Sequence, residues 1–169
     1  MNYTQAIKYI HNTPKFSRVL GNDLLRALLD KINNPHNGLS VIHIAGTNGK
    51  GSAAAMISQI LTESGFKVGL YTSPYIMRYN ERIKINGVDI DDGDLARETT
   101  IVRDIIKKYD TPVSEFALGT AIAIDWFNKC KCDFVVLETG LGGRLDATNV
   151  IQKPLVSVIM SIGLDHTQY

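Results

Sequence analysis

The residues of this 169-residue chain whose types and spacing are best suited to chemistry form one glycine-rich heptapeptide, Gly46-Thr47-Asn48-Gly49-Lys50-Gly51-Ser52. Its glycines let backbone N–H groups come close to phosphate oxygens. A helix after the loop would add free N–H groups and the positive end of its dipole. Lys50 can neutralise the β- and γ-phosphates of a nucleotide, and the Ser52 hydroxyl can bind Mg²⁺. We therefore predict that all seven residues bind ATP.

The heptapeptide departs from the common P-loop pattern, G-x₄-G-K-[S/T], at two places. Ile44 stands where the first glycine of that pattern belongs, and Gly51 separates Lys50 from the hydroxyl residue. An ordinary kinase or GTPase loop is therefore not predicted. Another P-loop NTPase, or a nucleotide-binding module without catalytic activity, stays open as an alternative.

Two more polar groups follow strand-like runs. Glu138 comes directly after the apolar run 134–137, and Asp165-His166 come shortly after the run 155–160. Ligands of open α/β sheets gather at the carboxyl ends of the strands. We therefore expect Lys50, Glu138 and His166 on one rim. Magnesium prefers oxygen ligands, so the imidazole would be the unusual member of a metal site.

Four later stretches agree, in order, with patterns of the folate branch of the Mur ligase superfamily. They are T-S-P-[H/Y] within 71–75, the loop at 80–83, E-x-G-L-G-G-R-L-D-A-T-N within 137–149, and the D-H segment within 162–166. Together with the G-T-N-G-K-G-S loop, they make essentially the whole chain resemble folylpolyglutamate synthase/dihydrofolate synthase.

This resemblance implies an ATP- and Mg²⁺-dependent ligase that joins L-glutamate to a folate, or to dihydropteroate, through an acyl phosphate. The catalytic residues it implies are Lys50, Glu138 and His166. The metal ligands it implies are Ser52, Ser73, Glu138 and His166. The residues it implies around the pterin are Arg82, Phe116, Ala117, Leu145, Asp146 and Ala147.

The chain departs from the family pattern at two positions. Ala117 replaces the glutamate of a frequent F-E pair, and Glu115, two residues earlier, would point elsewhere on a helix. Thr139 replaces the usual valine, and its hydroxyl would need a partner if buried. An ion pair between Arg144 and Asp146, and the roles of the glycines within 140–143, stay open.

Family members run to more than twice this length, so the resemblance implies an incomplete fold. Residues 1–169 would form the N-terminal ATP-binding domain. A C-terminal glutamate-ligase domain, and a carbamylated lysine that helps hold magnesium, would lie beyond Tyr169. We expect little or no turnover from this chain alone, and a monomer for the full-length enzyme.

The elements that position these residues alternate along the chain. At the N-terminus, a short helix and a connection are expected from the apolar residues Ile7, Ile10, Phe16 and Leu20. Further helices are expected at 24–32, 53–64, 94–109 and 114–129. Strands are expected at 41–45, 67–71, 133–137 and 155–160, with a hairpin around Asn86-Gly87. This order predicts an α/β fold of the Mur ligase central-domain type, with a mostly parallel sheet flanked by helices and a small hairpin insertion.

Composition narrows the class of protein. A net charge of +1 gives no basic excess for nucleic acid, and no apolar run approaches the ~20 residues that span a bilayer. The N-terminus lacks the pattern of a secretory signal, so a cytoplasmic protein with no membrane partner is expected. Cys130 and Cys132 are expected to be free thiols at a helix end.

Overall fold

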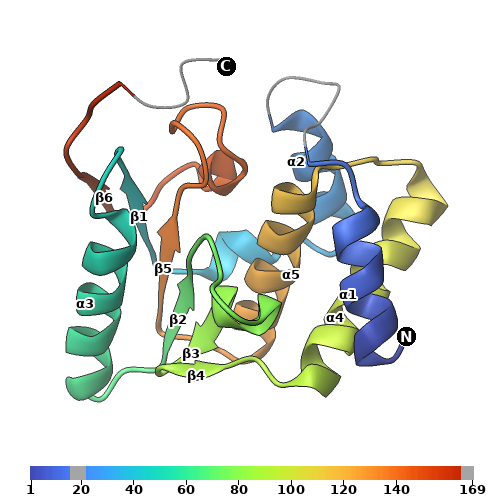
Figure 1. Ribbon diagram of the computed structural model, residues 1–169, viewed down its shortest axis with the longest axis horizontal. Helices are drawn as coiled ribbons and strands as arrows, with labels where there is room; N and C mark the ends of the chain where they lie inside the picture. The colour runs from blue at the N-terminus through green and yellow to red at the C-terminus, as the bar shows by residue number, and fades with distance from the viewer. Residues whose placement is uncertain (16–21, 165–169) are drawn as a thin grey trace.

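A mixed six-stranded sheet organises the computed structural model of the chain, which describes residues 1–15 and 22–164 (Figure 1). The strand order is β4-β3-β2-β5-β1-β6. The strands β2, β5, β1 and β6 are parallel, and β3 and β4 run antiparallel at one edge. Their bounds are β1 Val41–Ala45, β2 Val68–Tyr71, β3 Ile83–Ile85, β4 Val88–Asp89, β5 Phe134–Glu138 and β6 Val156–Ile159.

Helices cover both faces of the sheet. Helix α3 packs on one face, and α5 packs on the other with α1, α2 and α4 around it (Figure 1). The helices are α1 Tyr3–Asn12, α2 Asp23–Lys31, α3 Lys50–Glu63, α4 Asp92–Tyr109 and α5 Glu115–Lys129, and the short 3₁₀ helices are η1 Pro35–Gly38, η2 Tyr79–Arg82 and η3 Ala147–Val150. The predicted α/β architecture with a mostly parallel sheet is therefore confirmed.

The central strands are apolar on both faces because each face carries a separate core. Ile44 and Val136 belong to the smaller core, which also contains Ala54 of α3. Val41 and Leu137 belong to the larger core around α5. Successive residues of β1 and β5 thus point to opposite sides, as the pleat of a strand requires.

Local signals set most of the element boundaries. Asn86 and Gly87 have φ values of 47° and 78°, which form the predicted hairpin turn between β3 and β4. The side chains of Asp91 and Ser114 accept hydrogen bonds from backbone N–H groups in the first turns of α4 and α5. The predicted contributions of Phe16 and Leu20 to the N-terminal segment lie outside the described residues.

Most predicted boundaries differ from the structure by no more than two residues, but the predicted start of α3 is wrong by three: the helix begins at Lys50 and not at Ala53. Gly49 adopts a left-handed φ of 82° immediately before the helix, and Lys50, Gly51 and Ser52 already form its first turn. A glycine-rich stretch reads as a loop from its composition. Here a single left-handed glycine ends the turn and starts the helix.

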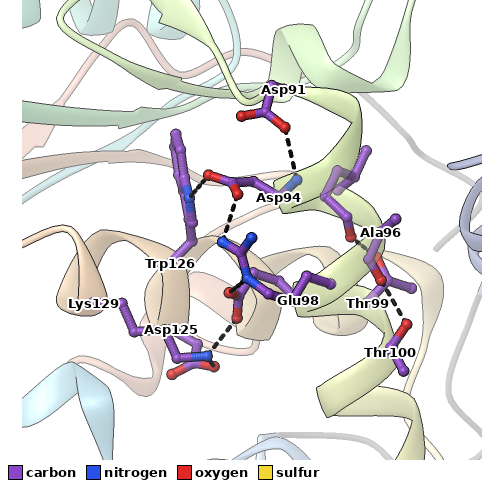
Figure 2. Close-up of polar contacts among 11 residues, drawn as sticks. Asp91, Asp94, Ala96, Glu98, Thr99, Thr100, Asp125, Trp126 and Lys129 are labelled. Atoms are coloured by element: carbon purple, nitrogen blue, oxygen red, sulfur yellow. Dashed lines mark hydrogen bonds and ion pairs between the residues drawn. The ribbon is translucent and has the colours of Figure 1, made fainter. Parts of the chain in front are cut away.

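A cluster of charged side chains joins α4 to α5 (Figure 2). The carboxylate of Glu98, which is 1% exposed, accepts a 2.6 Å hydrogen bond from Lys129 Nζ. Lys129 also lies 2.8 Å from Asp125, and Arg97 lies 3.4 Å from Glu98. Burial raises the pKa of Glu98, and Lys129 opposes that shift. The cations are needed here because an unpaired buried carboxylate would be costly.

Two further expectations can be compared with the described part of the chain. None of its helices is both long and apolar enough to cross a membrane. Cys130 and Cys132 are free thiols, as predicted. Cys130 lies directly after α5, and Cys132 is buried.

Candidate active site at the carboxyl edge of the sheet

Three neighbouring parallel strands end at the same edge of the sheet. The glycine-rich loop follows β1, Ser73 lies just after β2, and Glu138 is the last residue of β5. Because β5 pairs with both β1 and β2, these three segments are brought together at one rim (Figure 1). The predicted meeting of Lys50 and Glu138 is therefore present in the fold. His166 lies outside the described residues.

Glu138 is the buried carboxylate of this rim, with 4% of its surface exposed. Its Oε2 accepts a 2.9 Å hydrogen bond from the backbone N–H of Ser73. A Cβ placed on Gly51 would lie 3.6 Å from both carboxylate oxygens, so the first turn of α3 approaches this side chain closely. Burial raises the pKa of Glu138, while the Ser73 N–H and the charges of Lys50 and Arg82 oppose the shift.

The glycine-rich loop, residues 46–52, leads directly into the first turn of α3. The N-cap residue, Gly49, has no side chain to cap the start of α3, so among the described residues N–H groups of the first turn are left for another acceptor. Lys50 Nζ donates a 3.1 Å hydrogen bond to the backbone carbonyl of Thr47, which keeps the ammonium group on the loop. Asn48 and Ser52 are exposed.

The segment after β6 supports the base of this loop. Gly46 has a φ of 137°, and a Cβ there would lie 2.7 Å from Cβ of Met160. The backbone N–H of Thr47 donates to the carbonyl of Ser161 at 2.8 Å, and the Thr47 hydroxyl donates to the carbonyl of Gly163 at 3.1 Å. Only glycine fits at position 46, because both its φ and the contact with Met160 exclude a side chain.

The oxygen atoms at this rim fit a magnesium ion. Glu138 has a single described hydrogen-bond donor, so its carboxylate has lone pairs left for a cation. Ser73 lies beside it, and Ser52 lies in the adjacent first turn of α3. Among residues 1–15 and 22–164, no three His, Cys, Asp or Glu side chains cluster as a metal site. A magnesium site here would have Glu138 as its carboxylate ligand, and the roles of Ser52 and Ser73 as hydroxyl ligands, which the family resemblance implies, stay predictions.

Arg82 and Phe116, two of the predicted pterin residues, line one aromatic pocket of about 360 Å³. The Arg82 guanidinium lies 5.2 Å from the ring centroid of Tyr75 and 5.4 Å from that of Tyr79. Its Nε and Nη1 are buried without a hydrogen-bond partner among the described residues. The other lining residues are His11, Lys15, Tyr71 and Glu115.

Several of these lining residues were not predicted from the sequence. Tyr75 and Tyr79 lie on the two sides of an exposed loop, and His11 comes from the end of α1, so no spacing in the sequence links them. Glu115 lines the pocket from the first residue of α5. Ala117 is instead buried in the larger core.

The other predicted pterin residues, at 145–147, lie in the loop after β5. Leu145 is 57% exposed, whereas Asp146 is 6% exposed. Ala147 begins η3 and packs against the larger core. Among the ion pairs of the described residues, none joins Arg144 to Asp146. The Asp146 carboxylate instead accepts hydrogen bonds from other residues of this loop and of η3, so it stabilises the structure of the loop.

Position 140 of this loop requires a glycine because of an aromatic neighbour. A Cβ on Gly140 would lie 2.7 Å from the Phe116 ring. The loop after β5 therefore packs directly on the aromatic pocket. Thr139, the residue before it, is fully buried, and its hydroxyl has no partner among the described residues.

Comparison with known proteins gives relatives along almost the whole chain. No family model matches. Folylpolyglutamate synthase of Lacticaseibacillus casei is 42% identical over 98% of the chain, which spans 40% of that relative. Dihydrofolate synthase/folylpolyglutamate synthase of Bacillus subtilis is 41% identical over 97% of the chain, which spans 39% of it.

Solved structures agree with these relatives. A folylpolyglutamate synthase complex with AMPPCP and folate has a TM-score of 0.94 at 42% identity, over 99% of this chain and 42% of that one. Folylpolyglutamate synthase of Thermotoga maritima has a TM-score of 0.90 at 38% identity, over 96% of this chain and 38% of that one. The chain thus spans about two fifths of the proteins that it matches.

Proposed function

We propose that this chain, which matches the N-terminal region of folylpolyglutamate synthases, supplies the ATP site, a magnesium site and part of the folate pocket of an ATP-dependent ligase. The ligase joins L-glutamate to a folate and releases ADP and phosphate. Residues 1–169 would be its N-terminal domain, in a cytoplasmic enzyme that works as a monomer.

The approach of Gly51 and Ser73 to the Glu138 carboxylate is the observation that carries this proposal. It places a buried acid beside the start of α3, where a nucleotide's phosphates would accept hydrogen bonds from free N–H groups. A bound magnesium ion would neutralise charge on the phosphates. Lys50 would follow the γ-phosphoryl group as it leaves ADP, because its flexible ammonium group needs only to leave the Thr47 carbonyl.

The reaction would proceed through an acyl phosphate on the bound substrate. ATP transfers its γ-phosphoryl group to a carboxylate, either the γ-carboxyl of a folate or the benzoate carboxyl of dihydropteroate. The amine of L-glutamate then attacks the activated carbonyl and phosphate leaves. The rim would hold the carboxylate and the phosphate next to each other. Bringing two reactants together is a large entropic part of the barrier to such a transfer, and binding at the rim would meet that cost in advance.

The aromatic pocket would hold the flat part of the folate. Its tyrosine and phenylalanine rings offer stacking surface, and Arg82 has buried N–H groups that find no acceptor within residues 1–15 and 22–164. Phe116 packs on Gly140 and so links this pocket to the loop that follows Glu138. His166 and residues beyond Tyr169 would complete the site, together with a second domain that binds L-glutamate.

Nucleotide binding by the 169-residue chain tests the proposal. We expect magnesium-dependent binding of AMPPCP in calorimetry, and a loss of about 10-fold or more in affinity for Lys50→Ala, since a charged hydrogen bond to phosphate is removed. Lys8→Ala, an exposed lysine on α1, is the matched control. Equal affinities for the wild type and Lys50→Ala would refute the proposed phosphate site.

The same chain should show little or no folate- and glutamate-dependent release of ADP, because the proposal places part of the site beyond Tyr169. A nucleotidase or a simple nucleotide-binding module is the alternative. ATP hydrolysis that does not depend on folate would favour the nucleotidase.

A further inference from the structure

We infer that His43, Thr148 and Asp146 form a hydrogen-bonded relay that positions the loop after Glu138 against β1, the strand that leads to the glycine-rich loop. They are positioning residues, and none needs to touch a ligand. The functional part of this inference rests on the proposed function. The relay itself is defined by contacts within the chain.

The relay crosses from the centre of β1 to η3. The Nε2 atom of His43 lies 2.7 Å from the hydroxyl oxygen of Thr148. That hydroxyl donates a 2.6 Å hydrogen bond to Oδ1 of Asp146. All three residues are buried, with exposed fractions of 8%, 0% and 6%. Water therefore competes little for these bonds, and each partner depends on the next.

The direction of every proton in the relay follows from the donor count. Four donors converge on the Asp146 carboxylate: the backbone N–H groups of Gly140 and Leu141 at 2.8 Å, and the N–H and hydroxyl of Thr148 at 2.9 and 2.6 Å. Since the single hydroxyl proton of Thr148 is donated to Asp146, the Thr148 oxygen can only accept from His43. His43 must therefore carry a proton on Nε2.

Three sets of contacts hold the loop after Glu138 in place. Asp146 closes residues 140–146 by binding the two N–H groups at their start. Its backbone carbonyl accepts a 2.7 Å hydrogen bond from the side chain of Asn22, which is buried next to α2. His43 lies opposite Leu137 in the pairing of β1 with β5, one residue before Glu138. The bonds thus fix the loop relative to β5, which ends at Glu138, and to β1, which leads to the glycine-rich loop.

This arrangement assigns Asp146 a different task from that of a pterin ligand. Each of its carboxylate oxygens already accepts two hydrogen bonds from the chain, which leaves little capacity for a substrate. Through Gly140, the loop that it closes presses on Phe116 of the aromatic pocket. A change in the relay should therefore reach folate binding through the loop.

Thr148→Val tests the relay because valine keeps the shape but removes the hydroxyl. Two-dimensional NMR of the wild-type chain should show His43 as the Nε2–H tautomer. In Thr148→Val that preference should weaken, and hydrogen exchange of the Gly140 and Leu141 amides should accelerate by about 10-fold, as expected for the loss of roughly one hydrogen bond. Thr148→Ser should restore both signals.

Thr99→Val is the matched control. Thr99 is also fully buried and also donates a hydrogen bond, to the carbonyl of Leu95, but it lies in α4 away from the loop. It should leave the His43 tautomer and the two amides unchanged, whatever it does to global stability. A Thr148→Val chain with an unchanged tautomer and unchanged exchange would overturn the relay.

Folate titration separates the relay from its proposed purpose. Thr148→Val should weaken folate binding by about 10-fold and change the affinity for Mg-AMPPCP by less than about twofold, because the glycine-rich loop keeps its own contacts. Equal weakening of both ligands would overturn the loop-positioning role. A wild-type chain that binds no folate would count against the proposed function alone, since the NMR measurements test the relay without ligand.

Discussion

The backbone N–H of Ser73 donates a hydrogen bond to the carboxylate of Glu138, and this contact joins the ends of two parallel strands. Without this bond, only the pairing of β2 with β5 would hold the two strand ends near each other. The bond holds Oε2, and both carboxylate oxygens lie close to the first turn of α3, 3.6 Å from a Cβ placed on Gly51. A small change at Glu138 should therefore affect a bound cation more than it affects the fold.

Glu138→Gln should abolish most of the magnesium dependence of nucleotide binding. Glutamine keeps the shape and can still accept from Ser73, but it lacks the negative charge that a divalent cation needs. We expect the affinity for Mg-AMPPCP to fall by about 10-fold or more, in the range seen for disturbed metal sites, with metal-free binding nearly unchanged. Glu63→Gln, exposed at the end of α3, is the control. Equal magnesium dependence in both variants would contradict the role of Glu138.

Thr139→Val should be neutral or stabilising by up to about 1 kcal/mol. The Thr139 hydroxyl is buried without a partner among the described residues, so its removal ends a desolvation cost at nearly constant volume. The free energy of unfolding from urea titration is the measurement. A loss of more than about 1 kcal/mol would mean that this hydroxyl makes a hydrogen bond of normal strength.

Gly119→Ala should destabilise the chain even though alanine favours helices. A Cβ at position 119 would overlap the hydroxyl of Tyr79 and lie 2.8 Å from that of Tyr71. We expect an overpacking cost of about 1–3 kcal/mol, offset by a propensity gain of about 1 kcal/mol, and so a net loss of up to about 2 kcal/mol. The double variant Gly119→Ala/Tyr79→Phe removes the worst overlap and should recover part of the loss. No recovery would show that the Tyr79 hydroxyl is not the obstacle.

Lys129→Met should destabilise the packing of α4 on α5. It leaves the buried carboxylates of Glu98 and Asp125 without their shared cation (Figure 2). Because the Lys129 side chain is 43% exposed and Arg97 also contacts Glu98, we expect about 2 kcal/mol, below the cost of breaking a fully buried pair. Lys108→Met, on the exposed part of α4, is the control. Lys129→Met/Glu98→Gln should be more stable than Lys129→Met alone.

His43 should make the chain less stable in mild acid. Burial lowers the pKa of His43 below the ordinary 6.5, and the charge of Asp146 opposes the shift only in part. As the pH falls below about 6.5, the unfolded chain takes up the proton first, so stability is lost until the folded-state pKa is reached. The free-energy difference between the wild type and His43→Asn should therefore shrink from about pH 7.5 to about pH 5.5. A constant difference would mean that His43 has the same pKa in both states.

Much of the fold follows from patterns that are local in the sequence. The run Val41 to Ala45 is apolar on both faces and matches β1 from end to end. Asn86-Gly87 marks the hairpin between β3 and β4 because both residues tolerate positive φ. The start of α3 could not be placed in this way, because it depends on the left-handed conformation of one glycine among several.

The candidate site also has one part that local sequence patterns predict and another part that only the fold brings together. Lys50 and Glu138 could be predicted to meet because each follows a strand of a parallel sheet. The aromatic pocket could not, because His11, Tyr75 and Glu115 come from three distant segments with no shared spacing. His43 was missed for another reason: in a buried strand it reads as one more core position, and only its distance to Thr148 reveals its partner.

The contacts of Gly46 and Thr47 with residues 160–163 imply an order of events during biosynthesis. The heptapeptide leaves the ribosome more than a hundred residues before the segment that supports its base. A nascent chain that stops before Met160 would carry every residue of the heptapeptide and still lack the scaffold that shapes it. Nucleotide capture should therefore appear late in translation, as a single step, once β6 has joined β1.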